Sequence, residues 1–177
     1  MQIGVLFGGV LMAAAVALAG EDSPAVAAGA AAPEFSVPST AGTNATLAGL
    51  KGKWVVLYFY PRSFTPGCTA EACSLRDGYA ALQALGAVIL GASLDDLERQ
   101  KKFKAEHNLP FELLADSDKA LAKAYNVLGL GGLVAKRHTY LIDPDGKIAQ
   151  IITDVKTGEH ERQVREALEA LQAKQKP

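Results

Sequence analysis

The strongest constraint on the fold is an unbroken apolar and aromatic run, Trp54-Val-Val-Leu-Tyr-Phe-Tyr60, which ends at Pro61. A strand with one face in water alternates apolar and polar residues, whereas this run is apolar or aromatic at every position. It therefore predicts a strand that is buried on both faces. Such a strand needs neighbouring strands in a sheet and a layer of structure on each side. We expect it to be a central strand of an α/β protein.

Strand-like and helix-like segments alternate along the rest of the chain. The patterns predict helices at 66–85, 97–107, 118–125 and 159–173, and strands at 87–92, 111–115, 139–142 and 147–152. The last two strands would form a hairpin through Asp143-Pro-Asp-Gly146. This order predicts a mixed central sheet with helices on both faces, which is the arrangement of a thioredoxin-like sandwich.

Composition narrows the class of protein. The chain has 177 residues, of which 49% are hydrophobic, so it can bury the core of one globular domain. Its formal net charge is -1, and no basic run is present, so a nucleic-acid partner is not expected. Two cysteines are too few for a disulfide framework, and a chain of this size does not need one. We therefore expect the cysteines to matter for their chemical reactivity more than as structural crosslinks.

The N-terminal residues 1–19 form an uncharged apolar segment that ends in Ala17-Leu18-Ala19, a small-x-small pattern typical of a signal-peptidase site. We expect an export signal or a membrane anchor, so the protein would be periplasmic or membrane-tethered. No Lys or Arg precedes the segment, and a misassigned start codon, which would imply a cytoplasmic protein, remains open. Residues 20–32 would then be an Ala-rich tether, followed by the folded domain at 33–177.

Cys68 is a candidate nucleophile because of its place at a helix start. Thr65 followed by Pro66 predicts an N-cap and a first helical residue, so Cys68 falls at the third helical position. Unpaired backbone N–H groups and the helix dipole favour an anion there, which stabilises a thiolate. The alternative is that Cys68 is a small buried side chain without reactivity.

Cys73 follows five residues later, and this spacing is informative. In an unbroken α-helix the Cα atoms of residues i and i+5 lie about 8.7 Å apart. A disulfide needs a Cα separation below about 7 Å. If Cys68 and Cys73 pair, the turn between them must unwind, so oxidation would act as a conformational switch. Cys73 could instead be a packed residue on the inner face of the helix.

The segment Pro61-Arg-Ser-Phe-Thr-Pro-Gly-Cys68 resembles the Pro-x-x-x-Thr-x-x-Cys signature of peroxiredoxins. Cys73 at i+5, together with segments 108–116 and 137–143, is similar to the Q-type, or bacterioferritin-comigratory, branch. The resemblance extends from about Pro33 to the C-terminus. It implies a thiol-specific peroxidase that reduces hydrogen peroxide and organic hydroperoxides.

The resemblance also implies roles for individual residues. Cys68 would be the peroxidatic cysteine and Cys73 the resolving one. Thr65 would hydrogen-bond the peroxide, Pro61 would shield the pocket, and Arg137 would hold the thiolate and polarise the peroxide. A permanently charged guanidinium with several donors suits that task. Thr65 as a helix cap alone and Arg137 as a solvated charge remain alternatives.

The family cycle implies a sulfenic acid on Cys68 that condenses with Cys73 to form a disulfide. An external dithiol protein, thioredoxin or glutaredoxin, then reduces that disulfide.

We expect no cofactor or metal, because His107, His138 and His160 are scattered along the sequence. An intramolecular cysteine pair makes a monomer the expected state. Glu71 matches the family pattern Cys-Thr-x-Glu, and because a structural role is equally expected, it receives no catalytic assignment.

Two other functions remain open. A thiol-disulfide reductase of the same fold normally has two residues between its cysteines, whereas four residues separate Cys68 from Cys73. A copper-carrying module could combine the two thiolates with a histidine such as His138. The glycine-rich segment 128–134 is expected to be a mobile loop at the reductant surface or the mouth of the active site.

Overall fold

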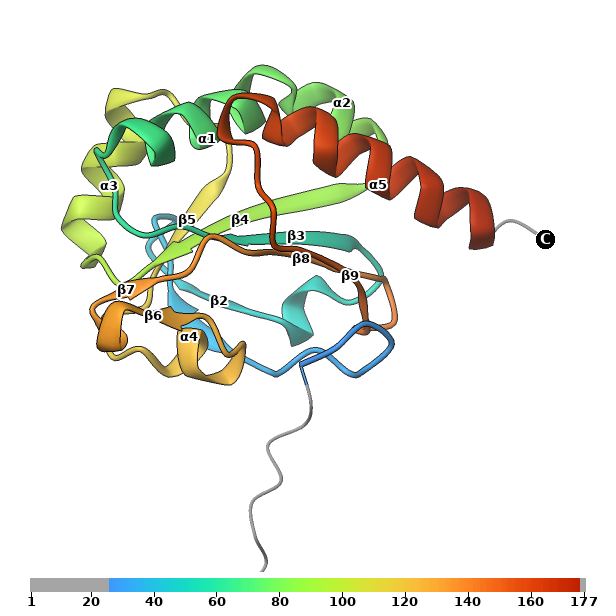
Figure 1. Ribbon diagram of the computed structural model, residues 1–177, viewed down its shortest axis with the longest axis horizontal. Helices are drawn as coiled ribbons and strands as arrows, with labels where there is room; N and C mark the ends of the chain where they lie inside the picture. The colour runs from blue at the N-terminus through green and yellow to red at the C-terminus, as the bar shows by residue number, and fades with distance from the viewer. Residues whose placement is uncertain (1–25, 176–177) are drawn as a thin grey trace, which may run out of the picture.

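The computed structural model describes residues 26–175, and the apolar segment at 1–19 lies outside this range. A five-stranded sheet forms the centre of the molecule, in the order β5-β4-β3-β8-β9 (Figure 1). The strands are β3 (Trp54–Phe59), β4 (Ala87–Ser93), β5 (Glu112–Ala115), β8 (Thr139–Ile142) and β9 (Ile148–Ile152). β3, β4 and β5 run parallel, whereas β8 is antiparallel to both β3 and β9. The predicted mixed sheet is confirmed.

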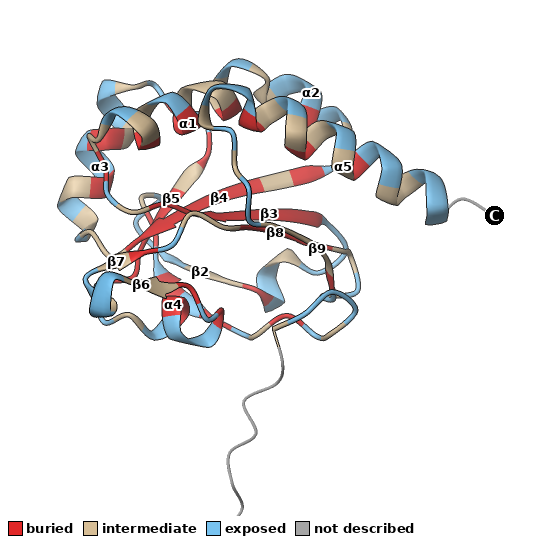
Figure 2. Cartoon of the chain, viewed as in Figure 1, coloured by how far each residue is buried: buried red, intermediate tan, exposed pale blue. Residues whose placement is uncertain are grey.

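Strand β3 is the central strand, and each of its residues is buried, as Figure 2 shows by its red colour. Because side chains alternate across a strand, β3 contributes to two separate hydrophobic cores. Val55, Leu57 and Phe59 belong to one core, and Trp54, Val56 and Tyr58 belong to the other. The continuous apolar run is therefore explained by burial on both faces.

One face of the sheet is covered by four helices: α1 (Pro66–Asp77), α2 (Tyr79–Ala84), α3 (Leu97–Glu106) and α5 (His160–Gln175) (Figure 1). The 3-10 turn η3 (Thr157–Glu159) precedes α5. The single helix expected at 66–85 is divided into α1 and α2 at Gly78. A Cβ at Gly78 would lie 2.1 Å from Glu161 Cγ, so the break coincides with the close approach of α5.

The other face carries one short helix, α4 (Ala120–Ala124), together with small hairpins. These are β1 (Ser36–Pro38) with β2 (Asn44–Thr46), and β6 (Leu128–Gly129) with β7 (Val134–Ala135). The 3-10 turns η1 (Ala48–Leu50) and η2 (Leu130–Gly132) complete this layer. Helices on both faces are confirmed, but the sequence did not predict the hairpins, because strands of two or three residues are too short to show an alternating pattern.

The ordered unit begins earlier than Pro33. Gly29 N donates to Ile148 O at 2.7 Å, and Ala32 N donates to Gly146 O at 2.9 Å. Ala31 forms an isolated bridge with Lys147, and Ala32 is buried. Part of the segment that the sequence assigned to a tether thus pairs along the edge of β9. Backbone hydrogen bonds of this kind leave no mark on an Ala-rich sequence.

Among the described residues, no helix combines the length and the apolar character that crossing a membrane requires.

Candidate active site

Cys68 lies where the central strand passes into a helix. The loop from Tyr60 to Thr65 connects β3 to α1, and Cys68 is the third residue of α1, as the sequence predicted. Its thiol is free, and the residue is only 1% exposed. The sulfur therefore lies at the end of the helix that carries unpaired N–H groups and the positive end of the dipole.

Thr65 occupies the N-cap position with an extended backbone (φ −89°, ψ 148°), but its side chain makes no capping hydrogen bond. Instead, Thr65 Oγ1 donates to Arg62 O at 2.9 Å. This bond uses the hydroxyl hydrogen and leaves the oxygen lone pairs free to accept. Thr65 therefore has the backbone conformation of an N-cap, but its side chain does not cap the helix. The side-chain oxygen can accept a hydrogen bond from a bound hydroxyl group.

Arg137 lies between β7 and β8 and reaches across to Cys68. Its Nη2 is 3.4 Å from Cys68 Sγ, and its Nη1 donates to a carboxylate oxygen of Glu71. The Arg137 side chain is only 24% exposed, so it is not the solvated charge that the sequence left open. Burial lowers the pKa of Arg137, but the charges of Glu71 and Cys68 raise it by more, and the group stays cationic beside the sulfur.

Glu71 is completely buried and has a second neighbour, His160. Glu71 Oε1 lies 3.2 Å from His160 Nδ1, although the two atoms are not aligned as a hydrogen bond. On its other side, His160 Nε2 is 2.9 Å from Thr139 Oγ1. The chain of polar groups thus runs from Cys68 through Arg137 and Glu71 to His160, and it joins α1, the β7–β8 connection and α5.

Sequence reasoning did not connect His160 with the site. The signal that could have shown its burial is spacing, because His160, Val164 and Leu168 recur every four residues and all three are buried on one face of α5. A polar residue on such a face needs a polar partner. The polar partners of His160 are Thr139 and Glu71, and the sequence had given Glu71 no catalytic role.

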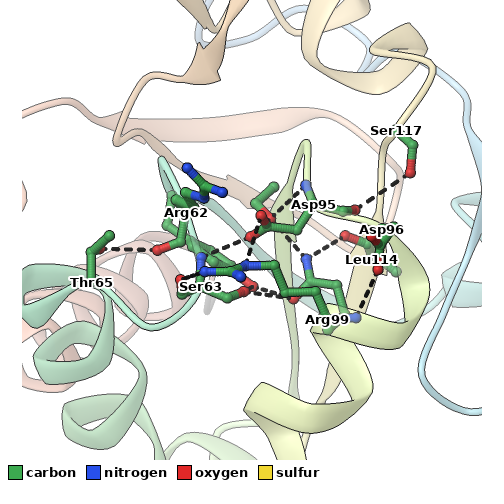
Figure 3. A network of polar contacts seen from close by, with 11 residues as sticks. Arg62, Ser63, Thr65, Asp95, Asp96, Arg99, Leu114 and Ser117 are labelled. Atoms are coloured by element: carbon green, nitrogen blue, oxygen red, sulfur yellow. Dashed lines mark hydrogen bonds and ion pairs between the residues drawn. The ribbon is translucent and has the colours of Figure 1, made fainter.

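The loop before Cys68 is held by a polar network, shown in Figure 3. Ser63 N donates to Asp95 Oδ2 at 2.7 Å, and Arg99 Nη2 donates to Ser63 O at 2.7 Å. Arg99 Nε is also 3.2 Å from Asp95 Oδ1. Phe64 has a left-handed backbone (φ 66°), and its ring centroid lies 5.1 Å from the Arg99 guanidinium. The network thus holds a strained residue next to Thr65.

A second group of buried polar side chains lies beneath this loop. Tyr60 hydroxyl donates to Gln100 Oε1, while Gln100 Nε2 donates to Ser93 Oγ and Leu114 O, each at 2.9 Å. Burial raises the pKa of Tyr60, so the phenol remains a protonated donor. None of these contacts was visible in the sequence, because each joins residues from different elements.

Cys73 is half-buried on the same helix, and its thiol is also free. Helix α1 is continuous from Pro66 to Asp77. The separation of about 8.7 Å expected between the Cα atoms of residues i and i+5 therefore applies, and the two cysteines lie outside disulfide range while the helix is intact.

Comparison with known proteins identifies the family. Residues 28–151 match the model of the AhpC/TSA family. Peroxiredoxin Bcp of Bacillus subtilis (strain 168) is 42% identical over 149 residues, which cover 81% of this chain and 93% of that protein. Peroxiredoxin Q of Xanthomonas campestris has a TM-score of 0.73 at 34% identity, covering 77% of this chain and 90% of that structure. The chain belongs to the AhpC/TSA family of peroxiredoxins.

A further structure concerns the alkyl peroxide reduction activity of the bacterioferritin comigratory protein of Xanthomonas campestris. It has a TM-score of 0.72 at 34% identity, covering 80% of this chain and 92% of that structure. The resemblance to the Q-type branch is confirmed, and this peroxiredoxin is a thiol peroxidase with the thioredoxin-like fold. The reductase and copper-carrier alternatives are therefore set aside.

The glycine-rich segment of this peroxiredoxin lies beside the loop that precedes Cys68. A cavity of about 290 Å³ is lined by Pro61, Arg62, Leu94, Asp95, Leu133 and Val134. Leu130 and Leu133 are the large apolar side chains most exposed among residues 26–175, at 77% and 76%. The segment thus borders Pro61, although it is a short β6–β7 hairpin and not an unstructured loop.

Proposed function

We propose that Cys68 is the peroxidatic cysteine of this thiol peroxidase. The observation that carries this proposal is the position of its sulfur, at the start of α1 and 3.4 Å from Arg137 Nη2. The thiolate attacks one peroxide oxygen, the O–O bond breaks, and the departing oxygen takes a proton and leaves as water or an alcohol. Cys68 becomes a sulfenic acid. Arg137 stabilises the charge that develops on the departing oxygen.

Thr65 and Pro61 complete the proposed peroxide site. The Thr65 hydroxyl hydrogen is already bonded to Arg62 O, so its oxygen is available to accept from the O–H of a hydroperoxide. Pro61 belongs to the loop that precedes Cys68 and lines a cavity beside that loop, and in the proposed site it would limit the access of water to the sulfur. Cavity residues such as Leu133 and Val134 are compatible with the alkyl group of an organic hydroperoxide as well as with hydrogen peroxide.

Cys73 is the proposed resolving cysteine. Its thiol sulfur attacks the Cys68 sulfenic acid, the S–S bond forms, and water leaves. Because an intact α1 keeps the two residues about 8.7 Å apart, the turn between them must unwind first. An external dithiol protein of the thioredoxin or glutaredoxin type then reduces the disulfide.

Stopped-flow mixing with hydrogen peroxide tests these assignments. In the wild type, rapid loss of one thiol should precede formation of a disulfide between the peptides that contain Cys68 and Cys73. Cys68→Ser should abolish the first step. Cys73→Ser should retain it and accumulate sulfenic acid, which dimedone would trap. Rapid peroxide consumption by Cys68→Ser would contradict the proposal.

The exposed apolar pair Leu130 and Leu133 is the proposed docking surface for the dithiol protein, because Leu133 lines a cavity together with Pro61, which belongs to the loop that precedes Cys68. The double variant Leu130→Ser/Leu133→Ser should lower turnover about tenfold with a protein reductant such as thioredoxin, since apolar contacts dominate such interfaces. Turnover with dithiothreitol, which needs no protein surface, should stay unchanged. An equal loss with both reductants would argue against docking at this pair.

The remaining proposals concern the state of the protein in the cell. The apolar character of residues 1–19 and the Ala17-Leu18-Ala19 pattern support export, with a periplasmic or membrane-tethered product. A mass measurement of the mature N-terminus would distinguish cleavage, anchoring and a misassigned start. Because both cysteines lie in one chain, the proposed cycle can run in a monomer, which light scattering would test.

A further inference from the structure

His160 is the buried polar group that the proposed mechanism does not use. It is 0% exposed, and its two ring nitrogens face Glu71 and Thr139. Its ring also stands edge-on to Tyr58, with ring centroids 6.0 Å apart. A histidine enclosed in this way has no path to substrate, so any influence on the reaction must pass through its neighbours, of which Glu71 bonds to Arg137.

Glu71 holds Arg137 in position. The guanidinium uses Nη1 for Glu71 and Nη2 for Cys68, so the direction of the Glu71 carboxylate sets the direction of the whole fork. His160 Nδ1 lies 3.2 Å from the other carboxylate oxygen and limits how that carboxylate can turn. The contact from α5 therefore reaches the reacting sulfur through two charged groups.

Glu71 also lies within the six-residue segment from Cys68 to Cys73 that must unwind for a disulfide to form. Unwinding of this segment would therefore displace Glu71 from both Arg137 and His160. The next residue after this segment, Ser74, is held differently: its Oγ accepts from Glu161 N at 3.1 Å. Consecutive residues at the start of α5 thus contact the part of α1 that must move and the part just beyond it.

We propose that His160 is a positioning residue that holds Glu71, and through it Arg137, in the arrangement that reduces peroxide, and that this contact opposes the unwinding that brings Cys73 to Cys68. The second half of this proposal rests on the resolving role proposed for Cys73. Weakening the contact should change the two chemical steps in opposite directions. Oxidation of Cys68 slows because Arg137 is less well oriented, whereas disulfide closure accelerates because less structure opposes the open state.

Two substitutions distinguish the contributions of the two ring nitrogens of His160. Asn can place an amide nitrogen near the position of Nδ1, facing Glu71. Gln reaches toward the position of Nε2, facing Thr139, and leaves Glu71 without its neighbour. His160→Gln should lower the rate constant of Cys68 oxidation about tenfold and raise that of disulfide closure severalfold. His160→Asn should keep both rate constants within about twofold of wild type.

The experiment is stopped-flow oxidation of the full chain by hydrogen peroxide, with quenched samples analysed by mass spectrometry for sulfenic acid and disulfide. Gln172→Ala is the matched control, because Gln172 also fastens α5, through Leu85 O at 2.7 Å, but far from the cysteines along the helix. It should lower the melting temperature without shifting the two steps in opposite directions. Glu71→Gln, which removes the charge facing His160, should reproduce the opposite shifts and serves if His160→Gln does not fold.

Parallel loss of both rate constants in His160→Gln would mean that His160 only stabilises the fold, and it would overturn the proposal. Equal behaviour of the Asn and Gln variants would overturn the role of the Glu71 contact. If wild-type protein forms no Cys68–Cys73 disulfide, the resolving role of Cys73 fails. The effect of His160 on the first step is still measured in that case, so the two failures are distinguishable.

Discussion

Arg137 makes two contacts through one rigid, planar group, which a lysine side chain lacks. Its two terminal nitrogens bond to Glu71 and Cys68 at the same time, and the planar fork keeps their directions related. Lys136, next to it in the chain, is exposed. The positive charge alone is therefore not what distinguishes Arg137. Its distinguishing feature is a rigid group that contacts the Glu71 carboxylate and the Cys68 sulfur at once.

Arg137→Lys should lower the second-order rate constant with hydrogen peroxide about 100-fold, the size expected when a donor to a developing negative charge is lost. The matched control is Lys136→Met, which removes the neighbouring charge and should stay within about twofold of wild type. Stopped-flow fluorescence or competition with a peroxidase of known rate would measure both. Equal losses in the two variants would show that general electrostatic attraction, and not the fork, is responsible.

At the level of elements, the packing of β3 against β4 depends on the absence of one side chain. Gly91 in β4 pairs with Tyr58 in β3. A Cβ at Gly91 would lie 2.6 Å from Tyr58 Cζ and 2.8 Å from Leu113 Cδ2. Tyr58 is fully buried and stacks on Tyr60, with ring centroids 5.5 Å apart, so it has no room to withdraw.

Gly91→Ala should therefore reduce the free energy of unfolding by about 2 kcal/mol, which is typical of an overpacked core. Gly158→Ala is the control, because a Cβ there meets nothing within 4 Å and its φ is not positive, so the change should stay within about 0.5 kcal/mol. Urea denaturation followed by circular dichroism measures both values. A wild-type stability for Gly91→Ala would contradict the overpacking and would mean that the side chains of Tyr58 and Leu113 can move aside.

Glu112 joins three parts of the molecule. It lies in β5 and accepts from Lys104 Nζ in α3 at 2.6 Å and from Thr40 Oγ1, which follows β1. Partial burial raises the pKa of Glu112, but these hydrogen bonds and the Lys104 charge lower it by more, so the net pKa lies below its ordinary value of 4.5. The folded state thus releases this proton more readily than the unfolded state.

The sign of the pH dependence follows from that difference. The contribution of Glu112 to stability is fully present above pH 4.5 and is lost as the pH falls through the lower pKa of the folded state. Glu112→Gln should make the melting temperature fall less steeply between about pH 5 and pH 3. Glu98→Gln, in an exposed pair with Lys101, is the control and should leave the slope almost unchanged. Identical slopes for wild type and Glu112→Gln would refute the assignment.

Much of the fold could be read from local patterns. The buried run at 54–60, the helix start at Thr65-Pro66 and the turn at 143–146 all depend on residues that are close in sequence, and the structure has each of them. The division at Gly78, the β1–β2 hairpin and the docking of Gly29 on β9 depend on distant partners. No local pattern encodes such partners, so these features were missed.

The candidate site divides in the same way. The strand, the cap and the proline placed Cys68 at a helix start, because capping and periodicity act over a few residues. Arg137 is 69 residues away and was singled out by family resemblance, and His160 was named only as one of three scattered histidines. Only the register of β8 beside β3 and the docking of α5 on α1 bring these side chains to Cys68. The position of the Cys68 sulfur at a helix start was thus readable from its sequence neighbours, whereas the charged groups around it meet through long-range packing.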